Sequence, residues 1–290
     1  MSEQNIIAII CDCDGTLCPD TTEGLVRKLG CDPKKFWNTV YQCVQKGWDP
    51  PLAYLNKLIA LSKVVKTPLT LDLLREVAEE VDFFPGALDF VIRLQERLDG
   101  IPDYRDAGIK IELTIISSGI AEILKYTKLG QIVKQIYGCS FDYDEKGTVI
   151  GIKRVVSFTE KTKFVFAVNK GINAEELLRK PYRVNDNIDS EQRRVPITHM
   201  IYIGDGPSDI PCFSLIKDYK GNVIGVMAPE DKELRKPYEL SEGKRLTIGP
   251  YTADYTNGTD LYKMLSRYVD GIANKILAEQ AERIRPAPTH

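Results

Sequence analysis

Four short segments of the chain are rich in apolar residues, the first of them without interruption, and polar or glycine residues directly follow the first three. They cover residues 6–11, 109–116, 199–203 and 223–227. Continuous, β-branched runs of this kind are typical of strands buried on both faces of a parallel sheet. Between them apolar residues recur at helical spacing, over residues 88–95, 120–129 and 164–168. The alternation predicts an α/β fold with an open, Rossmann-like parallel sheet, where ligands bind beyond the carboxyl ends of the strands.

A helical segment interrupts this alternation after the first strand. Gly30 is placed like a helix stop, Asp32-Pro33 like a helix start, and Asp49-Pro50-Pro51 like a second break. We therefore expect an inserted α-helical domain at residues 20–84, and a catalytic α/β core formed by residues 1–19 and 85–290. Residues 143–147 predict a hairpin turn. The charged segment 180–196 is interpreted as a solvated loop rather than a binding one.

Composition narrows the classes of function. The chain has 290 residues, of which 43% are hydrophobic, enough for a substantial core, and a net charge of -2. This balance gives no field that favours nucleic acid or a membrane surface, so neither is an expected partner. The seven cysteines contain no CxxC pair and indicate reduced thiols. The first apolar run has no basic leader before it and is too short for a membrane span or a signal core, so a cytoplasmic protein is expected.

Asp12 and Asp14 come directly after the first predicted strand. Side chains alternate along a strand, so both carboxylates should face one pocket. Two such groups repel unless they share a proton or hold a hard cation. A plain Asp-Gly turn is the structural alternative. A calcium-binding loop is excluded here because the residues after Asp14 do not have the spacing of that motif. Such a loop is also excluded at residues 142–144, because Lys153 occupies the position of the required glutamate.

A second acidic pair, Asp205 and Asp209, follows the third apolar segment in Gly204-Asp205-Gly206-Pro207-Ser208-Asp209. The glycines let the backbone approach a ligand closely. A dinucleotide motif is excluded because Asp209 replaces its third glycine and would repel a pyrophosphate. A role in supporting a metal fits this pair better.

Two further segments offer groups that bind anions. Ser117-Ser118-Gly119 presents a hydroxyl and backbone amides at an expected helix start, although serines there are often only helix caps. Lys161 and Lys163 begin another expected helix, against the preference of the helix dipole, which makes one of them a candidate for an anion. The two histidines, His199 and His290, do not support a Ser-His-Asp site.

Taken in order, the segments IIAIICDCDGTL, LTIISSG, a lysine that opens a helix, and MIYIGDGPSD resemble the four motifs of the haloacid dehalogenase (HAD) superfamily of phosphatases. The resemblance covers residues 5–19 and 85–260. The helical insert between the first two motifs is similar to the cap domain of the phosphoserine-phosphatase-like members, which closes on a small substrate. The expected fold is therefore a HAD core with an inserted cap.

This resemblance assigns a role to each candidate residue. Asp12 would be the nucleophile that forms an aspartyl-phosphate, and Asp14 the general acid and base. Mg²⁺ would be held by Asp12, the main-chain carbonyl of Asp14, Asp205 and Asp209. The phosphate-binding residues would be Ser117, Ser118, Gly119 and Lys161. Lys161 is preferred to Lys163 because of its distance from the apolar run of the helix.

The expected function is hydrolysis of a small phosphorylated metabolite. Phosphoserine itself is disfavoured, because Thr21 stands where the similar phosphoserine phosphatases carry a cap glutamate, and Asn56-Lys57 stands near the place of their cap arginine. A phosphotransferase that uses the same intermediate is the nearest alternative. A catalytically idle binding protein with the same fold is the other. The oligomeric state is not predicted.

Overall fold

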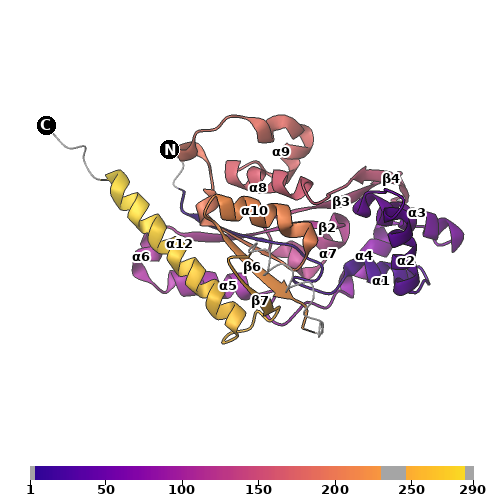
Figure 1. Cartoon of the computed structure of the whole chain (residues 1–290), viewed down its shortest axis with the longest axis horizontal. Coiled ribbons are helices and arrows are strands. Elements are labelled where there is room, and N and C mark those ends of the chain that lie inside the picture. Colours follow the sequence, from indigo (N-terminus) through magenta and orange to yellow (C-terminus); the bar gives the residue numbers. More distant parts are fainter. Residues whose placement is uncertain (1–3, 230–245, 285–290) are drawn as a thin grey trace.

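The structure is a computed structural model that describes residues 4–229 and 246–284. Its centre is one seven-stranded sheet with the order β4-β3-β2-β1-β5-β6-β7 (Figure 1). Neighbouring strands are parallel, except for the antiparallel pair β3 and β4. The strands are β1 (Ile6–Cys11), β2 (Lys110–Ile120), β3 (Gln135–Tyr143), β4 (Val149–Arg154), β5 (Met200–Gly204), β6 (Asn222–Met227) and β7 (Ile248–Thr252). The predicted α/β class with a parallel, Rossmann-like core is confirmed.

The central strand β1 has β2 on one side and β5 on the other. Ile9 pairs with Leu113 of β2 and with Ile201 of β5. Directly after β1, the backbone N–H of Asp12 donates to the carbonyl of Ile203 at 3.0 Å. The register therefore places Asp12 at the carboxyl edge of the sheet, in its middle.

Helices cover both faces of the sheet. One face carries α8 (Glu160–Lys170), α9 (Ala174–Arg179) and α10 (Ile210–Asp218), and the other carries α5 (Phe90–Asp99), α6 (Pro102–Asp106) and α12 (Asp260–Ile284). Successive residues of β1 serve the two cores in turn: Ile10 packs with residues of α8 and α10, while Ile9 packs with residues of α5 and α12. None of the helices within residues 4–229 and 246–284 is long and apolar enough to cross a membrane.

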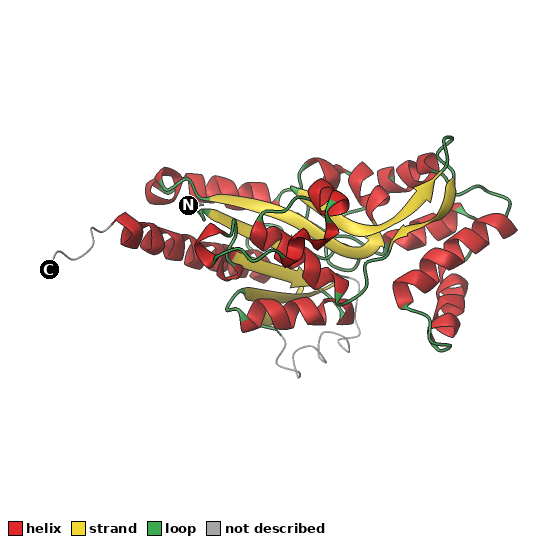
Figure 2. Ribbon diagram, turned by 90° about the horizontal axis from the view of Figure 1, so that it is seen from above, coloured by secondary structure: helices red, strands yellow, loops and turns green. Residues whose placement is uncertain are grey.

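The segment between β1 and α5 is helical, as expected. It forms α1 (Thr21–Lys28), α2 (Pro33–Val44), α3 (Pro50–Val64) and α4 (Leu71–Glu79). Asp32 and Asp49 cap α2 and α3, accepting the N–H groups of Lys35 at 2.9 Å and Leu52 at 3.2 Å. These four helices, called the helical insert below, lie together beyond the end of the sheet (Figure 2).

The β3–β4 hairpin reaches the helical insert. Its turn lies where the sequence predicted it, with the N–H of Gly147 donating to the carbonyl of Asp144. The N–H of Leu71 donates to Gly147 at 2.9 Å, and the N–H of Val149 donates to Leu69 at 2.8 Å. Backbone hydrogen bonds thus fix the α3–α4 connection against the core.

Two local expectations differ from the structure. Ser117-Ser118-Gly119 does not begin a helix, because β2 continues to Ile120 and the six-residue helix α7 (Ala121–Tyr126) starts only after it. The segment 180–196 is not simply solvated, because Lys170 Nζ donates to the carbonyls of Val184 and Asp186 and holds part of it against α8.

Arg194, at the end of the same segment, forms a bidentate pair with Glu112 at 2.7 and 2.5 Å. Glu112 lies near the amino end of β2, away from the carboxyl edge where Asp12 lies. The interpretation of this segment as a non-binding one is thus compatible with its position in the fold.

Candidate active site

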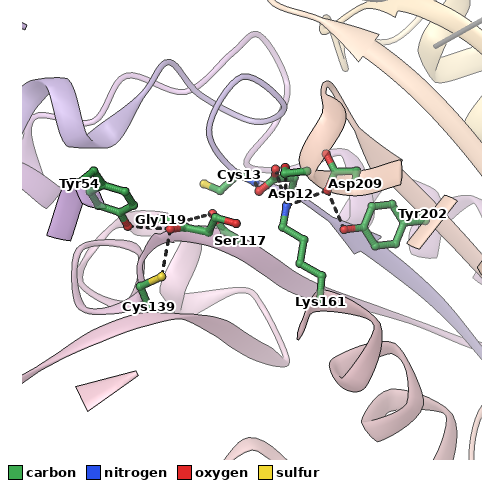
Figure 3. Close-up of polar contacts among 11 residues, drawn as sticks. Asp12, Cys13, Tyr54, Ser117, Gly119, Cys139, Lys161, Tyr202 and Asp209 are labelled. Carbon is green, nitrogen blue, oxygen red and sulfur yellow. Dashed lines mark hydrogen bonds and ion pairs between the residues drawn. The ribbon is translucent and has the colours of Figure 1, made fainter. Parts of the chain in front are cut away.

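Asp12 is the central residue of the site. Its side chain is only 7% exposed. The N–H of Cys13 donates to Asp12 Oδ1 at 2.7 Å, and Lys161 Nζ donates to Asp12 Oδ2 at 2.8 Å (Figure 3). Each carboxylate oxygen therefore has a donor, which fixes the orientation of the group.

Asp14 faces the same cavity as Asp12, as the alternation along the strand predicted. The N–H of Thr21, the first residue of α1, donates to Asp14 Oδ1 at 2.8 Å. Burial, and then the charges of Asp20 and Asp12, raise the pKa of Asp14 to about 8, against the lowering effect of the Thr21 hydrogen bond. At neutral pH this carboxyl group is protonated in the protein alone, a form that can donate a proton.

Lys161, on the first turn of α8, is fully buried. Besides Asp12, its Nζ donates to Asp209 Oδ1 at 2.8 Å and to Ser208 Oγ at 3.1 Å. Burial lowers the pKa of Lys161, but the carboxylates of Asp12 and Asp209 outweigh this and raise it above its ordinary value. Lys163 instead pairs with Glu160 on the same helix. The structure thus brings Lys161, and not Lys163, to the acidic residues.

Asp205 and Asp209 complete an acidic cluster. One carboxylate oxygen each from Asp12, Asp205 and Asp209 lie within 4.8 Å of one another. Burial raises the pKa of Asp209 to about 6 against the charge of Lys161, and its Oδ2 is buried without a hydrogen-bond partner among the described residues. Three hard oxygen donors, one of them unsatisfied, are the set that Mg²⁺ or a similar divalent cation prefers.

A glycine is needed at the point where the segment that carries Asp12 and Asp14 approaches the segment that carries Asp205. Gly15 has a φ of +77°, and a Cβ added there would lie 2.4 Å from Asp205 Oδ2. No side chain fits in that space, and the positive φ is unfavourable for other residues. Gly15 therefore allows Asp205 to approach the loop that carries Asp12 and Asp14.

The segment Ser117-Ser118-Gly119 lines the cavity opposite the acidic cluster. Ser117 is buried, and its Oγ accepts the N–H of Gly119 at 2.9 Å. A Cβ on Gly119 would lie 2.5 Å from Asp14 Oδ2. Both serines thus line the cavity, although no helix amino terminus supports them.

Two tyrosines that sequence reasoning missed support the site. Tyr202, in β5, is fully buried and donates its hydroxyl to Asp209 Oδ1 at 2.9 Å. Tyr54, in α3, donates its hydroxyl to the carbonyl of Ser118 at 2.6 Å. In sequence, Tyr202 is one apolar residue of a strand and Tyr54 one aromatic residue of a helix. Only the sheet register and the docking of the helical insert reveal their partners.

The cavity is lined on the core side by Asp12, Asp14, Asp205 and residues 117–119, and it has a volume of about 370 Å³. The helical insert forms its other wall, with the side chains of Trp37, Val40 and Tyr54. Trp37 and Val40 pack on the core and also face the cavity. Thr21 and Asn56-Lys57, the positions compared with phosphoserine phosphatases, are not among its lining residues.

Comparison with known protein sequences identifies a relative but no family. No family model matches the chain. An uncharacterized protein of Borreliella burgdorferi is 24% identical over 295 residues, covering 90% of this chain and 96% of that protein.

Several solved structures are similar to the chain. A HAD family hydrolase from Salmonella enterica serovar Typhi has a TM-score of 0.55 and 16% identity, over 90% of this chain and 70% of that one. A phosphoserine phosphatase solved as a phospho-aspartyl intermediate analogue has a TM-score of 0.53 and 15% identity, over 91% and 99%. A probable phosphoserine phosphatase from Vibrio cholerae has a TM-score of 0.54 and 13% identity, over 94% and 68%. The chain has the HAD fold of the phosphoserine-phosphatase type, as its four motifs predicted.

Proposed function

We propose that the protein is a Mg²⁺-dependent phosphomonoester hydrolase that acts on a small phosphorylated metabolite through an aspartyl-phosphate on Asp12. The observation that carries the proposal is the position of Lys161, which is buried between Asp12 and Asp209 at 2.8 Å from each. A buried ammonium held by two carboxylates is costly to desolvate and contributes little net stability, so such a site points to function. The similarity to a phosphoserine phosphatase with a phospho-aspartyl analogue supports the same reaction.

The residues of the site can carry out the hydrolysis in two steps, the formation of the aspartyl-phosphate and its breakdown by water. In the first, a carboxylate oxygen of Asp12 attacks phosphorus, the bond between phosphorus and the ester oxygen breaks, and Asp14 gives its proton to the leaving alcohol. In the second, water attacks the phosphorus of the aspartyl-phosphate, its proton passes to Asp14, and phosphate leaves with Asp12 restored. The pKa of Asp14, raised to about 8 chiefly by burial, suits the donating role.

Lys161, Ser117, Ser118 and Gly119 would bind the oxygens of the phosphoryl group. The bond of Lys161 to Asp12 supports this role for the lysine, and the other three residues line the cavity. Mg²⁺ would be held by Asp12, Asp205, Asp209 and the main-chain carbonyl of Asp14. When bound, the ion would neutralise the converging carboxylates and draw negative charge from the phosphoryl oxygens.

The helical insert, residues 20–84, is proposed to be a cap over this site, with residues 1–19 and 85–290 as the catalytic core. Its contribution to the cavity wall supports this role, because a wall made by a separate helical unit can exclude water from the reacting groups. The free state of all seven cysteines is compatible with the cytoplasmic location that we propose.

The test is the release of p-nitrophenol from p-nitrophenyl phosphate, with and without Mg²⁺. We expect activity that is lost on chelation, restored by Mg²⁺, and lost in Asp12→Asn, which keeps the size of the side chain. Asp142→Asn is a matched control on an acid outside the cavity and should leave activity unchanged. Equal activity of Asp12→Asn and wild type would refute the mechanism.

The same assay with an added acceptor alcohol distinguishes hydrolysis from phosphotransfer. A hydrolase releases inorganic phosphate in amounts equal to p-nitrophenol. A phosphotransferase would release less phosphate and form the ester of the acceptor. A folded protein that binds phosphate but turns over none of a panel of esters would instead be the idle binding protein.

A further inference from the structure

The part of the cavity that lies beyond the phosphate-binding residues has an unusual charge. Among the lining residues within 4–229 and 246–284 there is no lysine or arginine, whereas Asp20 adds another carboxylate at the helical insert. In the proposed mechanism the negative charge of each other acid is neutralised. Lys161 and a metal ion neutralise the cluster of Asp12, Asp205 and Asp209, and a proton neutralises Asp14. Asp20 is therefore the acidic group that remains for the leaving group of the substrate.

Asp20 is held in place without any ligand. It is the N-cap of α1, and its Oδ1 accepts the N–H of Thr22 at 2.8 Å and of Glu23 at 3.3 Å. Burial raises the pKa of Asp20 to about 6, so it is mostly ionised at neutral pH. Its negative charge is a fixed part of the cavity.

The remaining wall is apolar and aromatic. Trp37 and Tyr54 lie with their ring centroids 5.9 Å apart and their planes inclined by 56°. Val40, Pro50, Pro51 and Phe158 add further apolar surface, and Thr22 lies beside them. The hydroxyl of Tyr54 is engaged with Ser118, so this tyrosine presents its ring rather than a polar group to a ligand. Inclined aromatic faces beside a carboxylate are an environment that attracts organic cations.

We infer, on the basis of the proposed phosphatase function, that the substrate is the phosphate ester of an alcohol with an apolar, positively charged head such as an alkylammonium group. Trp37 and Tyr54 would contact the head and Asp20 would balance its charge. An ester whose leaving group carries a carboxylate would be repelled by the carboxylates of the cavity, since the described lining residues offer no basic side chain to bind it. The low polarity of the cavity would strengthen this repulsion. This selection agrees with the sequence-based expectation that phosphoserine, which carries a carboxylate, is disfavoured.

The test uses three esters of similar size: phosphocholine, its neutral carbon isostere 3,3-dimethylbutyl phosphate, and 3-carboxypropyl phosphate. We expect kcat/KM to be highest for phosphocholine, roughly tenfold lower for the neutral ester, and lower again for the acid. Asp20→Asn should bring the ratio of phosphocholine to the neutral ester close to one, since it removes the charge and keeps the capping oxygen. Trp37→Leu should lower kcat/KM for phosphocholine by about tenfold.

Asp32→Asn is the matched control, because Asp32 caps the next helix, is exposed and lies outside the cavity. It should leave the ratio unchanged. Equal rates for the three esters, a preference for the acid, or a ratio unaffected by Asp20→Asn would overturn the inference while leaving the phosphatase function intact, provided that p-nitrophenyl phosphate is hydrolysed in an Asp12-dependent way. No hydrolysis of any ester would remove the proposed function, and the inference with it.

Discussion

Lys161 Nζ lies 2.8 Å from Asp12 Oδ2, although 149 positions separate the two residues in sequence. The contact joins the amino end of α8 to the carboxyl end of β1. It is fully enclosed, because Lys161 is wholly buried and Asp12 nearly so. One buried cation thus holds the orientation of the group that we propose as nucleophile.

Replacing Lys161 by methionine should abolish activity and destabilise the fold. The change keeps the length of the side chain but leaves Asp12 and Asp209 buried without their cation, and breaking a buried pair costs about 3–5 kcal/mol. Activity on p-nitrophenyl phosphate should fall by at least about 100-fold, and urea unfolding should show the loss of stability. Lys163→Met is the control, because Lys163 contacts Glu160 and the ring of Phe164 on its own helix rather than the acidic cluster. If Lys163→Met lost more activity than Lys161→Met, the lysine would be wrongly assigned.

Removing the hydroxyl of Tyr202 should weaken the response to Mg²⁺ more than it weakens folding. In Tyr202→Phe, Asp209 loses the donor at 2.9 Å that orients its carboxylate. Groups that orient metal ligands typically change metal affinity by about 10–100-fold. A titration of activity with Mg²⁺ should show a half-saturating concentration raised by about that factor. Tyr137→Phe, which removes a buried hydroxyl that bonds to Ile172 away from the site, should leave the Mg²⁺ response unchanged.

Gly119→Ala should inactivate the enzyme through a steric effect. The new methyl group would lie 2.5 Å from Asp14 Oδ2 and 3.1 Å from Ser117 Oγ, so one of these side chains must move. Misplacing a reacting group by about 1 Å can cost about 100-fold in rate, and kcat on p-nitrophenyl phosphate should fall by that order. Gly151→Ala, in β4, meets no atom within 4 Å and is the control. Normal kcat in Gly119→Ala would show that Asp14 and Ser117 need not hold these positions.

The contribution of His199 to stability should fall as the pH is lowered through the titration range of this residue. This histidine is buried, which lowers its pKa against the opposing charge of Glu279 at 3.2 Å. A base whose pKa is lower in the folded state binds more protons when unfolded. Its contribution to stability is therefore full above pH about 6.5 and is lost as the pH falls below that value.

Thermal unfolding at pH 7.5 and 5.5 measures this effect. We expect the midpoint of the wild type, relative to that of His199→Asn, to be lower at pH 5.5 than at pH 7.5, because only the wild type has the buried imidazole that takes up a proton. The raised pKa values of Asp14, Asp20 and Asp209 act in the opposite direction and are common to both proteins. A difference between the two proteins that is the same at both pH values would assign the acid sensitivity to other groups.

The seven thiols should separate into two classes of reactivity. Cys31 and Cys43 are partly exposed, whereas the other five are buried. Burial raises the pKa of Cys11, and a hydrogen bond between Cys13 and Cys18, followed by burial, raises that of Cys13. Thiols that stay protonated and inaccessible react slowly. Labelling with a thiol reagent should modify two residues in the native protein and seven after unfolding; rapid native labelling of more than two would contradict the described packing.

The sequence alone determined the parts of this protein that depend on local order. The apolar runs and the polar residues after them predicted the parallel sheet and the edge at which Asp12, Asp14, Asp205 and Asp209 gather, because the carboxyl ends of parallel strands share one edge. Proline, glycine and aspartate marked the helices of the insert through capping, which depends only on neighbouring residues.

The tertiary structure decided which residues meet across the fold. Lys161 and Lys163 differ in burial because residues two apart on a helix point in nearly opposite directions. Lys161 lies on the buried face with Phe164 and Val165, a spacing that the sequence already contains. The contacts of Tyr202 and Tyr54 depend on strand register and on how the insert docks, which no local pattern encodes. The charge and shape of the cavity arise in the same way, because the helical insert supplies one wall and the strand ends supply the other.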